Sequence, residues 1–111
     1  MKKIIITLFL IFGILFSSQS YAESIDQNVL EKEFVATRYE VWVFYGNDIH
    51  AKIDKIFINA LLKKDRETLQ KLYSITAKYM ENKNQDYLSK KDILVKYLLV
   101  RSYYELNYRM K

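Results

Sequence analysis

The chain has 111 residues, a formal net charge of +5, no Cys, no Pro, two Gly and one His. A chain of this length forms one domain at most. The missing Cys excludes disulfides, thiolate zinc sites and a cysteine nucleophile. The lone His excludes a metal site built from several His residues of one chain.

Residues 1–22 have the pattern of a secretory signal peptide. Two lysines precede an apolar run from Ile4 to Phe16, and the small residues Ser20 and Ala22 follow it in the spacing that signal peptidase reads. As a helix this run spans about 20 Å, against about 30 Å of membrane hydrocarbon, which argues against a retained anchor. We therefore expect cleavage after Ala22.

Removing this segment leaves residues 23–111 as a single helical domain of 89 residues with a net charge of +3. The leader carries no twin-arginine pair, so we expect export by the general secretion route. The product is then periplasmic if the cell has an outer membrane and secreted otherwise. The expected location outside the cytoplasm, and the absence of an RNA-binding or zinc-finger motif, argue against nucleic acid as a partner.

The near absence of Gly and Pro predicts an all-α fold, a small bundle of about four helices. The sequence Ser24–Gln27 resembles a capping box that opens the first helix. Residues 39–48 are ambiguous, because their β-branched and aromatic side chains are also typical of a strand, and residues 100–108 alternate as a partner strand would. We favour the helix. On a helix, four apolar side chains share one narrow arc: Leu30, Phe34, Val41 and Tyr45.

The next two segments predict an antiparallel helical hairpin. The second helix starts at Asn47 or Asp48, and the third is capped by Asp65 after a break at residues 64–66. The apolar face of the second helix consists of Ile49, Ile53, Ile56, Phe57, Ala60 and Leu61. That of the third consists of Leu69, Leu72, Tyr73, Thr76, Tyr79 and Met80.

A polar loop over residues 81–86 separates the hairpin from the last helix. Ser89 and Asp92 have the spacing of a capping box, and Leu88 is placed to pack on Ile93 as a hydrophobic staple. The last helix therefore has the best-defined start in the chain.

No residue pattern points to catalysis, a cofactor or a metal. His50 and Asp54 lie one helical turn apart, but no nucleophile motif accompanies them, so we expect a surface histidine beside a carboxylate. Carboxylates spaced two residues apart, such as Glu31 and Glu33, point to different sides of a helix. The sequence thus predicts a protein that is not an enzyme.

The last helix is apolar on two faces, which fits either a central core helix or a helix that also binds a partner. Tyr and Arg are enriched at protein interfaces, so the side of this helix that carries both is the candidate partner surface. The candidate partner-binding residues are Tyr97, Arg101, Tyr104 and Tyr108 of this helix, together with Trp42 of the ambiguous segment 39–48.

Charge is segregated along the chain: residues 23–50 carry two basic and six acidic side chains, whereas residues 51–111 carry fourteen basic and seven acidic ones. Together these features favour a protein-binding module of the inhibitor or toxin-immunity kind. The alternatives are a periplasmic holdase chaperone, an accessory subunit of an envelope or secretion complex, and a basic protein with weak contact to an anionic membrane surface. The partner is another protein or a second copy forming a homodimer.

Overall fold

The computed structural model describes residues 27–110, and the regular secondary structure of this part of the chain is all helix, without a strand. Its elements are α2 (Gln27–Leu62), α3 (Arg66–Met80), α4 (Lys90–Tyr104) and a closing π-helical turn, η2 (Glu105–Arg109). The all-α prediction is confirmed, and residues 39–45 are helix rather than strand. The predicted signal peptide, its cleavage site and the capping box at Ser24 lie outside the described residues.

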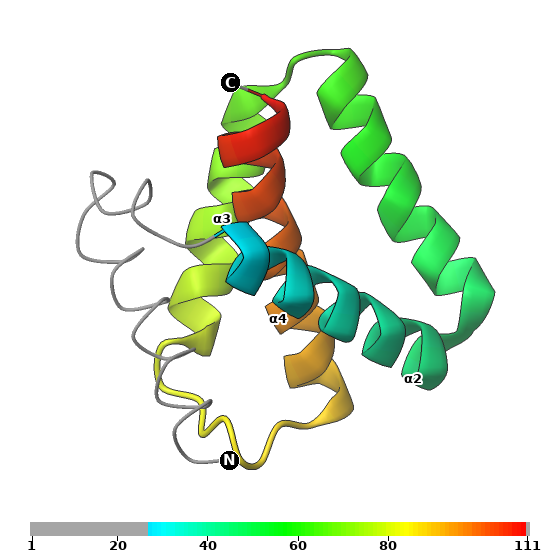
Figure 1. Ribbon diagram of the computed structural model, residues 1–111, viewed down its shortest axis with the longest axis vertical. Coiled ribbons are helices and arrows are strands. Elements are labelled where there is room, and N and C mark those ends of the chain that lie inside the picture. The colour runs from blue at the N-terminus through cyan, green and yellow to red at the C-terminus, as the bar shows by residue number, and fades with distance from the viewer. Residues whose placement is uncertain (1–26, 111) are drawn as a thin grey trace.

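Helix α2 is divided by Gly46 into a first arm (residues 27–45) and a second arm (residues 47–62). Gly46 has φ 82° and ψ 179°, a backbone conformation that only glycine adopts without strain. Figure 1 shows the two arms meeting at a sharp angle, with the first arm in cyan and the second in green. The described part of the fold therefore has three α-helices, the first of them bent at Gly46, and the ambiguous residues 39–48 are helical on both sides of that glycine.

The turn from α2 to α3 follows the hydrogen-bonding pattern of a Schellman motif. The N–H of Asp65 donates to the carbonyl of Ala60 at 2.8 Å, and the N–H of Lys64 donates to that of Leu61 at 3.1 Å. The side chain of Asp65 then caps α3 by accepting the backbone N–H of Thr68 at 3.1 Å. The predicted break and its cap are confirmed.

The predicted capping box at the start of α4 is also confirmed. The hydroxyl of Ser89 accepts the N–H of Asp92 at 3.1 Å, and the Asp92 carboxylate accepts the N–H of Ser89 at 3.0 Å. Tyr79 of α3 donates its hydroxyl to the same carboxylate at 2.8 Å, so the box also connects α4 to α3.

Helix α4 is the central element, because both α2 and α3 pack mainly against it and contact each other little. The turn of the predicted hairpin exists, but close pairing of its two helices does not. The side chains of α4 buried in this way are Asp92, Tyr97, Leu99, Val100, Arg101, Ser102 and Tyr103. Of the two interpretations of the last helix, this placement matches the central core helix.

The main apolar core joins both arms of α2 with α3, α4 and η2. Its fully or nearly fully buried members are Val41, Ile53, Phe57, Ala60, Leu69, Tyr97 and Leu106. Most positions that the helical period assigned to the core are buried or half-buried, but Ile56 is 55% exposed. The second arm therefore buries a narrower face than the sequence pattern suggests.

Candidate functional site

A cluster of charged side chains connects the two arms of α2 with α4. The carboxylate of Asp54, on the second arm, accepts a hydrogen bond from Arg38 Nη2 of the first arm at 3.2 Å. It also accepts one from Arg101 Nη1 of α4. Burial raises the pKa of Asp54, but the hydrogen bond and charge of Arg101 and the charge of Arg38 outweigh it, and the pKa is lowered. The carboxylate is therefore ionised and holds three segments together.

Both ring nitrogens of His50 are engaged within this cluster. Arg38 Nε donates to His50 Nε2 at 2.9 Å, and His50 Nδ1 lies 3.5 Å from Asp54 Oδ2. The predicted pairing of His50 with Asp54 exists. The sequence did not indicate that Arg38 and Arg101 would join them, because these residues come from distant parts of the chain.

Arg101 is 4% exposed, and its charge is compensated inside the domain. Its Nη1 also donates to the Tyr97 hydroxyl at 2.8 Å, and its guanidinium lies 4.6 Å from the centre of the Phe57 ring. Burial raises the pKa of Tyr97, which keeps that hydroxyl protonated. Arg101 is thus an internal cross-link and does not face solvent.

The five predicted partner-binding residues do not form one surface. Tyr97 and Arg101 are buried, which corrects the expectation that they face a partner. Tyr104 and Tyr108 are half-buried, and the ring of Tyr104 lies between those of Phe34 and Tyr108, with centroids 5.0 and 5.4 Å away. Only Trp42 is exposed, at 46%. These tyrosines pack within the domain because the first arm crosses α4 there.

An exposed apolar stripe runs along the outer face of the first arm, and we call it the elbow stripe. Its members follow one another at helical spacing and are 46 to 66% exposed: Val35, Tyr39, Trp42 and Val43. The opposite face of the same arm packs into the core through Leu30 and Val41. Sequence reasoning identified Trp42 but missed its neighbours, although their spacing of four, seven and eight residues from Val35 was readable.

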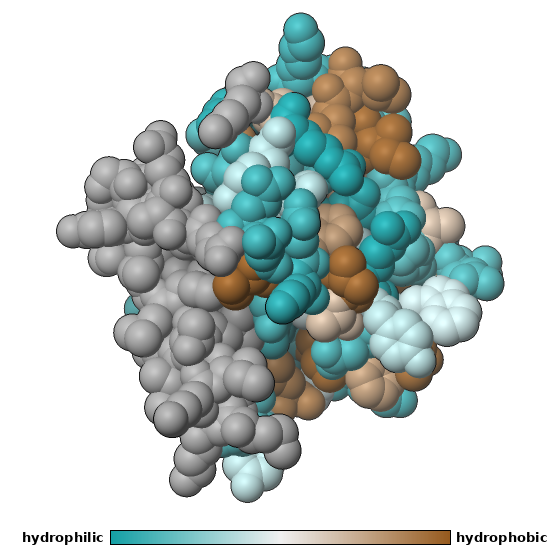
Figure 2. Space-filling model, in the orientation of Figure 1, coloured by the Kyte–Doolittle hydropathy of each residue, from teal (hydrophilic) through white to brown (hydrophobic). Residues whose placement is uncertain are grey.

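The described surface carries further exposed apolar side chains away from this stripe. Figure 2 shows brown apolar patches within a mostly teal surface, with the largest near the top, over the C-terminal end of α2. The exposed large apolar side chains of this end of α2 are Ile58, at 49%, and Leu62, at 77%.

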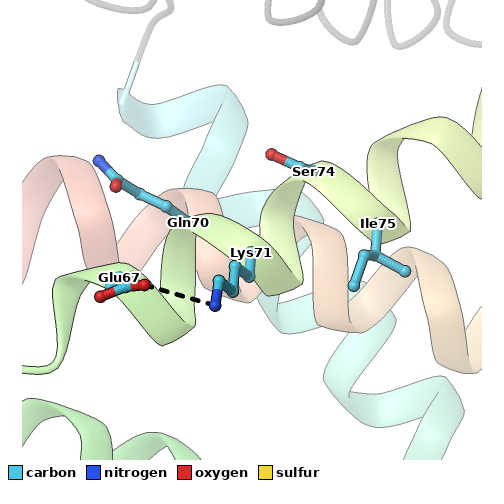
Figure 3. Close-up of a pocket in the computed structure, with 5 residues that line it drawn as sticks. All are labelled: Glu67, Gln70, Lys71, Ser74 and Ile75. Atoms are coloured by element: carbon cyan, nitrogen blue, oxygen red, sulfur yellow. Dashed lines mark ion pairs between the residues drawn. The ribbon is translucent and has the colours of Figure 1, made fainter.

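Two hollows on the described surface are small and open. One of about 260 Å³ lies along the outer face of α3, where Glu67 and Lys71 form an ion pair at 3.3 Å beside Gln70, Ser74 and Ile75 (Figure 3). Because all five residues come from one exposed helix face, this hollow does not surround a ligand. A second, of about 290 Å³, lies between the α2–α3 turn and η2.

Within residues 27–110 no group of His, Asp and Glu side chains is arranged to hold a metal ion. None of the described helices combines the length and apolar character needed to cross a bilayer. No family model matches the chain, and neither the curated proteins nor the solved structures include a significant match to it.

Proposed function

We propose that this chain is an exported, non-enzymatic protein-binding module that acts by occluding a partner, in the manner of an inhibitor or a toxin-immunity protein. In this proposal residues 1–22 are removed as a signal peptide. The remaining chain forms a four-helix bundle, whose helices are the first arm of α2, the second arm of α2, α3 and α4.

The elbow stripe is the observation that carries the proposal. Aromatic side chains with a polar tip, such as Tyr39, combine large contact area with hydrogen-bonding ability, and aromatic residues are enriched at protein interfaces. The indole N–H of Trp42 already donates to Asn47 Oδ1, so Trp42 contributes contact area. The first arm already buries its other face in the core, so this face is not needed for folding. A continuous exposed stripe of this kind favours a binding surface over a purely structural helix.

Charge favours a different protein, one with an acidic segment, as the partner rather than a second copy. The elbow stripe lies within residues 23–50, which carry two basic and six acidic side chains, so two copies paired stripe to stripe would bring like net charges together. A partner with an acidic segment would gain from the basic excess of residues 51–111, outside the stripe, where fourteen basic side chains face seven acidic ones. A homodimer is the alternative outcome for this surface.

The non-enzymatic part of the proposal is supported by the state of His50. One ring nitrogen accepts a hydrogen bond from Arg38, and the other faces the Asp54 carboxylate. A general base needs a free nitrogen within reach of a substrate proton. His50 is instead positioned to hold the two arms of α2 together.

The test is capture of a partner by tagged protein from its native envelope, compared between two variants. Val43→Asp places a charge in the elbow stripe, and Ile75→Asp places one at an equally exposed position on α3, where Ile75 is 68% exposed. We expect capture to be lost with Val43→Asp and retained with Ile75→Asp. The captured protein should also lose its activity when stoichiometric amounts of this chain are added.

Other outcomes would replace the proposal. Equal capture by both variants would remove the elbow stripe from the binding surface. Capture of many unrelated unfolded proteins would indicate a holdase, and co-purification with an assembled membrane complex would indicate an accessory subunit. Sedimentation with anionic vesicles that Val43→Asp abolishes would indicate a membrane-surface protein.

A further inference from the structure

The hollow between the α2–α3 turn and η2 is lined by three cationic side chains and no acidic one. We call it the basic hollow, and its lining residues are Leu61, Lys64, Arg66, Arg109 and Met110. Its volume of about 290 Å³ exceeds that of a single carboxylate or phosphate group. The residues come from three elements, so the hollow is a product of the fold and not of one helix face.

The positive charge of the basic hollow is only partly compensated. Arg109 Nε lies 3.3 Å from the buried carboxylate of Glu105, which fixes the arginine from behind. Arg66 Nη1 donates to the backbone carbonyl of Met110 at 2.9 Å, a contact that holds its position without cancelling its charge. Within residues 27–110, Lys64 forms no ion pair with a carboxylate. An anion in the basic hollow would therefore meet the uncompensated charges of Lys64 and Arg66, and the charge of Arg109, which Glu105 holds in place.

Lys64 occupies a backbone position that favours glycine. Its φ of 53° lies in the left-handed region, at the point of the Schellman motif where glycine is the usual residue. A lysine there costs conformational energy that glycine avoids. Backbone strain retained at a surface hollow points to a role for the side chain that the strained residue carries.

We infer that the basic hollow binds a carboxylate side chain from an acidic segment of the partner. This inference rests on the proposed function, because it assigns the anion to a protein. Charge-assisted hydrogen bonds from Lys64 and Arg66 would hold the carboxylate, and Arg109 would close its other side. Leu62, 77% exposed and next to the turn, adds an apolar contact for the same segment.

The test is a titration of the ¹⁵N-labelled protein with a capped hexaglutamate peptide, followed by NMR at low and at physiological salt. We expect shifts at the amides of Lys64, Arg66 and Arg109, and weaker binding at the higher salt concentration. A capped hexaglutamine peptide is the control for contacts that do not depend on charge.

Two variants separate the hollow from general electrostatic attraction. Lys64→Gly removes one lining charge and relieves the left-handed strain, so the protein stays folded and lost binding cannot reflect unfolding. We expect it to weaken hexaglutamate binding about three- to tenfold. Lys63→Gln removes the same charge from the adjacent residue, which does not line the hollow, and should weaken binding less than about twofold.

The inference is overturned if hexaglutamate shifts none of the three amides, or if the Lys63 and Lys64 variants lose binding equally. It is also overturned if inorganic phosphate or phosphatidylglycerol vesicles shift these amides and the peptide does not. Failure of the proposed function looks different: hexaglutamate would still bind at the hollow, while the Val43→Asp and Ile75→Asp proteins would capture partners equally.

Discussion

The guanidinium of Arg101, buried on α4, is held by the carboxylate of Asp54, which lies 47 residues earlier on the second arm of α2. The same carboxylate accepts a hydrogen bond from Arg38 on the first arm. One acidic side chain thus fixes the angle between the arms and docks both on the central helix.

Replacing Asp54 by Asn should destabilise the domain by about 2–4 kcal/mol, because it removes the counter-charge that is hydrogen-bonded to the buried Arg101 guanidinium. Urea denaturation at pH 7 measures this loss. Asp86→Asn, in the exposed loop before α4, is the control and should change the free energy of unfolding by less than about 0.5 kcal/mol. An equal effect of the two substitutions would show that the ion pair does not support the fold.

Tyr104→Ala should cost about 2–3 kcal/mol of stability, because the ring packs between those of Phe34 and Tyr108. Tyr104→Phe should retain most of that stability, since it keeps the ring. Tyr87→Ala, at a side chain that is 82% exposed, serves as the control. If Tyr104→Ala keeps wild-type stability and loses partner capture, Tyr104 belongs to the binding surface instead.

The capping box makes stability depend on acidity. The backbone hydrogen bond from Ser89 lowers the pKa of Asp92 to about 2, and the hydroxyls of Tyr79 and Ser89 contribute further, although burial opposes them. Because the folded-state pKa lies below the ordinary value of 3.8, this contribution is complete above about pH 4 and is lost as the pH falls towards 2.

Asp92→Asn should therefore cost about 1 kcal/mol at pH 7 and much less at pH 2.5. Urea denaturation of the wild-type and Asp92→Asn proteins between pH 7 and pH 2.5 measures the two free energies of unfolding. Their difference isolates Asp92, because the other carboxylates contribute equally to both proteins. Curves for the two proteins that stay parallel down to pH 2.5 would contradict the assignment to Asp92.

Gly46→Ala should destabilise the protein by about 1–3 kcal/mol, through backbone strain alone. A Cβ added at Gly46 meets no atom within 4 Å, so crowding does not contribute. Thermal unfolding followed by circular dichroism measures the loss. D-alanine introduced at this position by semisynthesis is the matched control, because it adds the same methyl group and accepts a positive φ. Equal destabilisation by the two alanines would assign the cost to the methyl group.

Lys64→Gly should instead stabilise the protein by about 0.5–1 kcal/mol, because glycine accepts the left-handed conformation at φ 53°. Chemical denaturation measures the gain, and Lys63→Gly, one residue earlier, is the control that should lose stability. A gain in stability together with weaker hexaglutamate binding would show that Lys64 is kept for its charge.

The sequence predicted the features that depend on neighbouring residues. The Asp65 cap and the Ser89–Asp92 capping box rest on side-chain to backbone hydrogen bonds within three residues, so their spacing in the sequence specifies them. The helical character of residues 39–45 was harder to predict, because β-branched and aromatic side chains favour strands unless tertiary packing decides otherwise.

Features that depend on distant residues could not be predicted. Nothing in the sequence near Arg101 indicates that its partner is Asp54, so the arginine was expected on a surface. The left-handed conformation of Lys64 is equally hidden, because glycine is the usual signal for it. The elbow stripe was missed for another reason: the helical period identifies apolar faces but not which of two faces the core uses.

The central place of α4 also constrains when the domain can form. Helices α2 and α3 contact each other little and pack mainly on α4, the last α-helix of residues 27–110. A growing chain that ends before residue 90 has its apolar faces but not the helix that covers them. Folding of this domain therefore begins only once α4 has been synthesised, and until then the chain stays open to proteins that handle unfolded polypeptides.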